Sequence, residues 1–94
     1  MLIYIYLYYM EKQPNFEEWF EEARKNGSQF IISVCDTFDW GDYPVYCKDA
    51  KELLRNIPSY DDVDMQKINE VIRIHSTPGI EERYFDYSKL LTEK

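Results

Sequence analysis

Aspartates are the residues of this chain best suited to chemistry, and they gather in two short clusters. The clusters occupy the segments CDTFDWGDY and YDDVDM, and their aspartates are Asp36, Asp39, Asp42, Asp61, Asp62 and Asp64. Carboxylates bind hard cations and act as general acids or bases. The three-residue spacing of the first cluster does not match the alternating ligand positions of an EF-hand loop. Carboxylate pairs are also inevitable in so acidic a chain, so we expect no metal site and no catalytic carboxylate pair.

Nucleophilic catalysis and zinc binding depend on histidine and cysteine, which are scarce here. The chain has one histidine, His75, and two cysteines, Cys35 and Cys47. A nucleophile needs a base within reach, and nothing in the spacing places His75 beside either thiol. Zinc ligands come in closely spaced pairs, which this sequence lacks. Three glycines in the whole chain also disfavour a phosphate-binding loop, so we expect a non-enzymatic protein without a cofactor.

The two clusters instead suggest a contact surface, because aromatic residues accompany the aspartates and no basic residue lies among them. Aromatic side chains provide desolvated anchors at interfaces, and acidic surfaces attract basic proteins. If both segments lie on the same edge of the molecule, they form one partner-binding face. The residues of this predicted face are Asp36, Asp39, Trp40, Asp42, Tyr43, Tyr60, Asp61, Asp62 and Asp64.

The overall charge supports a basic protein as the partner. The chain carries 18 acidic and 11 basic residues, for a formal net charge of −7. This charge repels nucleic acid, whereas a row of carboxylates can occupy a site that normally holds phosphates. In size, charge and aromatic content alone, the chain resembles DNA-mimicking inhibitors such as anti-restriction and anti-CRISPR proteins. The resemblance implies, as the more specific hypothesis, an inhibitor of a basic nucleic-acid-processing enzyme.

Two alternative functions remain open. Leu2 to Tyr9 alternates aliphatic residues with tyrosines, which predicts a strand with a tyrosine ladder on one face. The ladder could join two copies into a housekeeping homodimer or serve an adaptor. A metal-dependent enzyme that uses the aspartates is the less favoured alternative.

Two helices are predicted from capping residues and apolar periodicity. The first runs from Asn15, a good N-cap, to Asn26 before Gly27. The second runs from about Lys48 to Ile57 and ends at Pro58. Each places apolar residues three and four positions apart, so each has one face to bury.

Further strands are predicted on either side of the second helix. Phe30 to Phe38 is the clearest, with Phe30, Ile32, Val34 and Phe38 on one core-facing side. The segment 39–44 is expected to be a loop. Lys67 to His75 predicts another strand, with Ile68, Ile72 and Ile74 on one face. A turn at 76–79 and a returning strand over 81–87 follow, and then a short terminal helix around Leu90 and Leu91.

The predicted element order is therefore β-α-β-α-β-β in a single domain over residues 1–94. We expect an α+β fold, a two-layer sandwich in which two helices pack on one face of a small mixed or mainly antiparallel sheet. The opening MLIYIYLYYM is too short to span a bilayer and has neither a basic leader region nor a cleavage site. With few cysteines, we expect a cytoplasmic protein with reduced thiols and no membrane partner.

Overall fold

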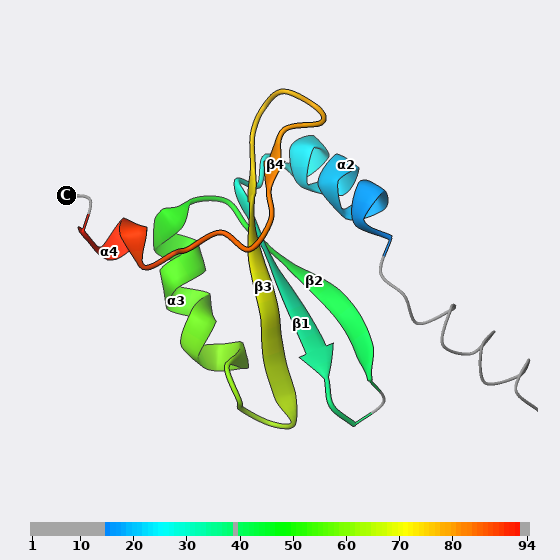
Figure 1. The fold of residues 1–94 in the computed structure, drawn as a ribbon, viewed down its shortest axis with the longest axis vertical. Helices are drawn as coiled ribbons and strands as arrows, with labels where there is room; N and C mark the ends of the chain where they lie inside the picture. Colours follow the sequence, from blue (N-terminus) through cyan, green and yellow to red (C-terminus); the bar gives the residue numbers. More distant parts are fainter. Residues whose placement is uncertain (1–14, 39, 93–94) are drawn as a thin grey trace, which may run out of the picture.

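Four antiparallel strands and three helices form the part of the chain that the computed structural model describes, residues 15–38 and 40–92 (Figure 1). Along the chain the elements are α2 (Phe16–Asn26), β1 (Phe30–Asp36), β2 (Gly41–Cys47), α3 (Ala50–Tyr60), β3 (Gln66–Ile74), β4 (Glu81–Glu82) and α4 (Lys89–Thr92). The strand order is β2-β1-β3-β4, so β1 and β3 are the central strands. The α+β class is as predicted, and the strand predicted over Leu2 to Tyr9 lies outside the described residues.

The capping residues set the limits of α2 as the sequence predicts. Asn15 is the N-cap, and its side chain accepts a hydrogen bond from the Glu18 backbone N–H at 3.2 Å. Gly27 ends the helix with φ 78°, a left-handed conformation that glycine adopts without strain. Trp19 and Ala23 lie buried on the inner face, with Phe16 and Phe20 half-buried beside them. The helix therefore contributes an aromatic stripe to the core.

Helix α3 is longer than predicted because Pro58 does not end it. Asp49 is its N-cap and accepts a hydrogen bond from the Glu52 N–H at 2.8 Å. Proline in the last turn deprives the helix of one backbone hydrogen bond. The chain nevertheless continues in the helix to Tyr60, and the Asp61 N–H then donates to the Ile57 carbonyl at 3.2 Å. Leu53 and Ile57 are its buried residues.

The segment 39–44, predicted to be a loop, instead contributes most of a second strand. Residues Gly41–Cys47 pair antiparallel with β1, with Gly41 opposite Asp36 and Cys47 opposite Phe30. Pro44 suggested a loop because it has no N–H for a β-ladder. It is tolerated here because β2 is an edge strand, and a proline N can face away from the single neighbour. The true turn is correspondingly short.

A bulge in β3 overturns the predicted alternation of its isoleucines. Ser33 of β1 pairs with Glu70, but the next residue, Val34, pairs with Ile68, so Asn69 is an extra residue. The bulge moves Ile68 to the face that carries Phe30, Ile32, Val34 and Val71. Ile72 and Ile74 instead lie on the opposite face with Ile31.

The turn between β3 and β4 lies at 76–79, where the sequence predicts it. Gly79 has φ 89°, and the Ile80 N–H donates to the Thr77 carbonyl, as in a type II turn.

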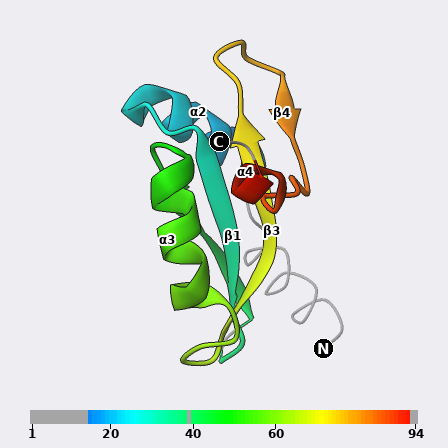
Figure 2. The ribbon, with the colours of Figure 1, turned by 90° about the vertical axis from the view of Figure 1, so that its left-hand side faces the viewer.

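The helices cover both faces of the sheet, so the prediction of two helices on one face is wrong. Helix α3 packs on the Phe30, Ile32 and Val34 side together with Leu90 of α4, and Figure 2 shows both helices in front of the sheet. Helix α2 packs on the Ile31 side, and Figure 1 shows it across the sheet from α3. Strand β1 is buried on both faces from Phe30 to Cys35, as expected of a central strand covered by a helix on each side.

An ion pair between a buried carboxylate and a partly exposed arginine joins the C-terminal segment to the α2 side of the sheet. Arg83 donates to both carboxylate oxygens of Glu70, at 2.7 Å from Nε and 2.5 Å from Nη2. Its guanidinium lies 4.1 Å from the centre of the Phe16 ring. The Glu70 side chain is only 4% exposed, so its charge is stable there only because Arg83 and the Tyr84 N–H pair with it.

None of the helices in the described residues is both apolar and long enough to cross a bilayer.

Candidate protein-binding site

The end of β1, which carries Asp36, and the loop that carries Asp61, Asp62 and Asp64 lie together at one end of the sheet, as a common face requires. The β1–β2 turn and the α3–β3 connection are neighbours at the bottom of Figure 1. Two hydrogen bonds join them, because the Thr37 N–H and hydroxyl both donate to the Met65 carbonyl, at 2.8 and 2.6 Å. We call residues 37, 38, 40 and 61–65 the tip.

The first loop of the tip is shaped by Asp36. Its side-chain Oδ1 accepts a hydrogen bond from the Phe38 N–H at 2.9 Å, and its backbone carbonyl accepts one from the Trp40 N–H at 2.7 Å. Such an aspartate-centred turn closes a hairpin without glycine. The Asp36 carboxylate is thereby engaged in the turn, at the edge of the tip.

The second loop of the tip is a two-residue turn between Val63 and Gln66. The Gln66 N–H donates to the Val63 carbonyl at 3.0 Å, and the two residues form an isolated β-bridge. Asp64 and Met65 between them both have positive φ, 52° and 62°, as in a type I′ turn. Asp61, Asp62 and Asp64 are exposed on this loop.

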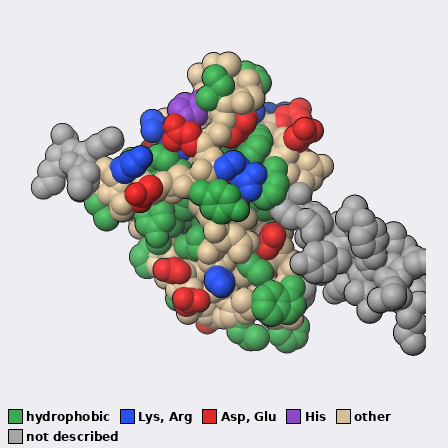
Figure 3. Space-filling view, in the orientation of Figure 1, with side chains coloured by type: hydrophobic (Ala, Val, Ile, Leu, Met, Phe, Trp, Pro, Cys, Tyr) green, Lys and Arg blue, Asp and Glu red, His purple; other side chains and the backbone are tan. Residues whose placement is uncertain are grey.

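Large apolar side chains are displayed among these carboxylates. Phe38, Trp40 and Met65 are 78%, 71% and 59% exposed, and Val63 is also exposed. These four account for most of the large exposed apolar side chains of the described residues. Figure 3 shows hydrophobic side chains at this end of the molecule. An apolar patch of this kind next to polar residues is typical of an interaction site.

The backbone of the tip holds these side chains in conformations that cost free energy. Trp40 and Met65 have φ 60° and 62°, and Asp62 and Asp64 have 57° and 52°. Only one other non-glycine residue of the described chain, Tyr84, has positive φ. Left-handed backbone at a non-glycine residue costs about 1 kcal/mol and clusters at functional positions. The concentration of such residues is a second sign of a functional surface.

Two predicted tyrosines support the tip from inside. Tyr43 of β2 and Tyr60 of α3 are half-buried on the α3 face, with ring centres 6.5 Å apart in an edge-on contact. Burial, and then the nearby Tyr60 and Asp36, raise the pKa of the Tyr43 hydroxyl. Both rings are therefore packing residues at the base of the tip, and they are less available for a partner than Trp40.

Asp42 does not join this arrangement. Because neighbouring residues of a strand point to opposite faces, Asp42 lies across the sheet from Tyr43. It accepts a hydrogen bond from the Asn69 side chain at 3.0 Å. Burial is the larger cause of the raised pKa of the Cys35 thiol, and the negative charge of Asp42 raises that pKa further. Asp39 lies outside the described residues. The predicted face is thus split by the sheet.

The most exposed apolar residues of the tip were not among the predicted site residues. Phe38 was assigned to the core-facing side of β1, but the strand ends at Asp36 and the chain turns before Phe38 can reach the core. Met65 was overlooked because a methionine next to three aspartates gives no chemical signal. The segment VDMQ, two residues between a valine and the next strand, was the available indication of a tight turn.

The histidine and the cysteines do not form a catalytic arrangement within the described ranges. His75 lies 3.2 Å from Glu82, and the Cys47 sulfur accepts a hydrogen bond from Asn56 at 3.6 Å. Both thiols are free and buried. Over the same residues, no three His, Cys, Asp or Glu side chains are grouped so that they could hold a metal ion.

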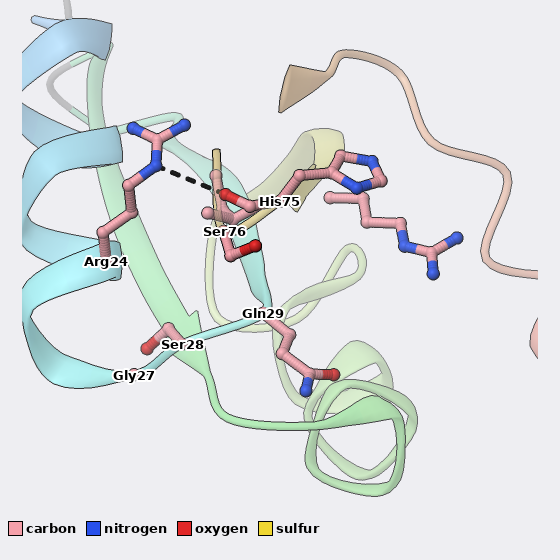
Figure 4. A pocket seen from close by; sticks show the side chains of 8 residues that line it. Arg24, Gly27, Ser28, Gln29, His75 and Ser76 are labelled. Carbon is pink, nitrogen blue, oxygen red and sulfur yellow. Dashed lines mark hydrogen bonds between the residues drawn. The ribbon is translucent and has the colours of Figure 1, made fainter. Parts of the chain in front are cut away.

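A polar hollow of about 480 Å³ lies at the opposite end of the sheet from the tip. Arg24, Ser28 and Ser76 are among its lining residues, and Figure 4 shows Arg24 Nε donating to the His75 carbonyl at 3.3 Å. No aspartate lines it.

Comparison of the chain with protein-family models, curated proteins and solved structures finds no match.

Proposed function

We propose that this chain is a small non-enzymatic binding module that uses its tip to hold a basic protein partner. One observation carries the proposal: Phe38, Trp40 and Met65 are exposed beside aspartates on two loops that are hydrogen-bonded to each other. Exposed Trp and Phe can insert into a pocket of the partner, and this insertion supplies most of the affinity at protein interfaces. The surrounding carboxylates select a basic partner and speed its association.

The more specific form of the proposal is inhibition of a basic enzyme that acts on nucleic acid. The net charge of −7 supports it, because such an enzyme has a surface that attracts anions. The inhibitor would then compete with the nucleic acid for that surface. Free thiols at Cys35 and Cys47 are also compatible with action in the reducing cytoplasm.

The proposal is tested by capture of partners from a lysate of the native host, with identification by mass spectrometry. The informative variant is Trp40→Gly combined with Met65→Gly, since glycine accepts positive φ at both positions and the fold should survive. We expect the wild type to capture a basic protein and the double variant to lose it. The matched control is Glu22→Lys on α2, an exposed residue at the opposite end of the sheet, which should retain capture.

Two results would contradict the proposal. One is equal capture by the wild type and the double variant. The other is capture that does not weaken as salt is raised to about 0.5 M, because exposed charge attraction is screened at that ionic strength. Competition by a duplex oligonucleotide for the captured protein separates the inhibitor form from simple binding.

A further inference from the structure

A groove of about 480 Å³ lies between α2 and the β3–β4 turn, away from the tip. Its apolar lining comes from Phe20 of the helix and Pro78 of the turn. Glu17 and Glu21 line it from the helix, because residues three and four apart share one helical face. Figure 3 shows acidic side chains gathered over this helix, beside the turn. The groove therefore combines aromatic surface with carboxylates.

One arginine of the chain, Arg24, already lines the groove and pairs with a glutamate on its other side. Arg24 forms an ion pair with Glu81, and it donates at 3.3 Å to the carbonyls of His75 and Thr77. Arg24 and Glu81 thus neutralise each other and hold the turn against α2. The lining has three glutamates against one arginine, so negative charge remains on Glu17 and Glu21. Within residues 15–38 and 40–92, neither of these two glutamates forms an ion pair.

The same side of the molecule already shows how it holds a guanidinium group. Arg83 stacks 4.1 Å from the Phe16 ring centre while Glu70 accepts two of its hydrogen bonds. Phe16 in turn stacks on Phe20, with ring centres 6.2 Å apart. Phe20 lies one helical turn further on and lines the groove together with Glu17 and Glu21. The groove thus offers a second guanidinium the same two groups, an aromatic ring and a carboxylate.

We propose that this groove binds an arginine side chain of a basic protein partner. A guanidinium stacks on an aromatic face and pairs with carboxylates in a fork geometry that lysine cannot reproduce. The aliphatic part of the arginine would cover Phe20 and Pro78. This inference rests on the proposed function only for the source of the arginine. The groove and the tip lie at opposite ends of β3, so they are separate contacts.

The test is a titration of the whole chain with N-acetyl-arginine amide, followed through backbone amide NMR shifts. Saturable shifts are expected around residues 17–24 and 77–81. Glu21→Gln should weaken binding about two- to five-fold, the range of one exposed ion pair. The matched control, Glu22→Gln, removes the same charge from the adjacent residue, which does not line the groove, and should leave the affinity unchanged.

Three outcomes would overturn the inference: no saturable shift, equal weakening by Glu21→Gln and Glu22→Gln, or equal affinity for the uncharged analogue N-acetyl-citrulline amide. Failure of the groove and failure of the tip are distinguishable. The Trp40→Gly, Met65→Gly variant should bind the arginine probe as the wild type does, whatever its effect on partner capture. Conversely, Glu21→Gln leaves the tip unaltered.

Discussion

Trp40 combines an anchoring side chain with a backbone conformation that tryptophan disfavours. Its φ of 60° lies in the left-handed region, where a Cβ crowds the following carbonyl. Its ring is 71% exposed, so little packing within the described chain offsets that cost. Selection for stability alone would favour glycine or asparagine here. The presence of tryptophan is the residue-level argument that the tip serves a partner.

We expect Trp40→Gly to leave the free energy of unfolding unchanged or to raise it by up to about 1 kcal/mol. The reason is that relief of strain offsets the flexibility that glycine adds to the unfolded chain. Phe38→Gly is the control, since Phe38 is equally exposed but does not have positive φ, and it should lose about 0.5–1 kcal/mol. Urea unfolding measures both. A larger loss for Trp40→Gly than for Phe38→Gly would contradict the account.

The buried thiols and tyrosines predict a loss of stability in alkali. Burial raises the pKa of the Cys47 thiol above its ordinary value of 9.0, and burial raises the pKa of Tyr46 above 10.0. The folded state then keeps protons that the unfolded state releases, so the free energy of unfolding falls as pH rises. This contribution is complete below about pH 9 and is lost above it.

Urea midpoints measured between about pH 7 and pH 11 test this expectation. The midpoint should be nearly constant up to pH 9 and then decline, and Tyr46→Phe should make the decline shallower above pH 10. A midpoint that stays level through this range, or a decline of equal slope in Tyr46→Phe, would show that the burial of these groups does not contribute to the pH dependence of stability.

At the level of single residues, the sequence predicted which aspartates lie near a turn. It could not predict toward which face of the sheet their side chains point. Asp36 and Asp64 follow core elements, as their sequence context indicates, but whether their two segments are adjacent was open until the structure placed the ends of β1 and α3 side by side. Asp42 was misplaced, because its direction depends on whether the segment after Trp40 is strand or loop. Phe38 was misplaced for a related reason, as the strand ended two residues earlier than its apolar pattern indicated.

At the level of elements, the caps were predictable because they are local. Asn15 and Gly27 act through hydrogen bonds or backbone angles within a few residues, and the structure has both as predicted. Strand β2 and the bulge at Asn69 were not predictable. Pro44 is acceptable only because β2 is at an edge, and the bulge depends on how β3 pairs with β1. Both depend on sheet order, which local patterns do not encode.

The ion pair between Arg83 and Glu70 is one of the contacts that hold the C-terminal segment to β3, and the Glu70→Gln variant measures its contribution. Replacing the carboxylate leaves Arg83 without its charged partner and weakens the bond from the Tyr84 N–H at 3.3 Å. We expect a loss of about 1–3 kcal/mol, because the Glu70 side chain is almost fully buried while the Arg83 side chain is 39% exposed and is hydrated once its partner is removed. Glu82→Gln, an exposed neighbour, should lose less than about 0.5 kcal/mol. Equal effects in urea unfolding would mean that the pair does not stabilise this segment.

At the level of the whole molecule, the net charge of −7 is to be considered together with the positions of the two proposed contact regions. The tip and the groove proposed to bind an arginine lie at opposite ends of a sheet whose faces are both covered by helices. A partner that contacts both ends must extend along the molecule. One that contacts only the tip needs a single pocket. Both arrangements require a basic partner, which is the common element of the account.

The measurement that tests this account most directly is the dissociation constant of the captured partner for the purified wild type and for the Trp40→Gly, Met65→Gly variant. Loss of two anchoring side chains from the tip should weaken binding at least about tenfold while the fold is retained. Urea unfolding of the same samples confirms the fold. Equal dissociation constants for the two proteins would contradict the assignment of the tip as the binding site.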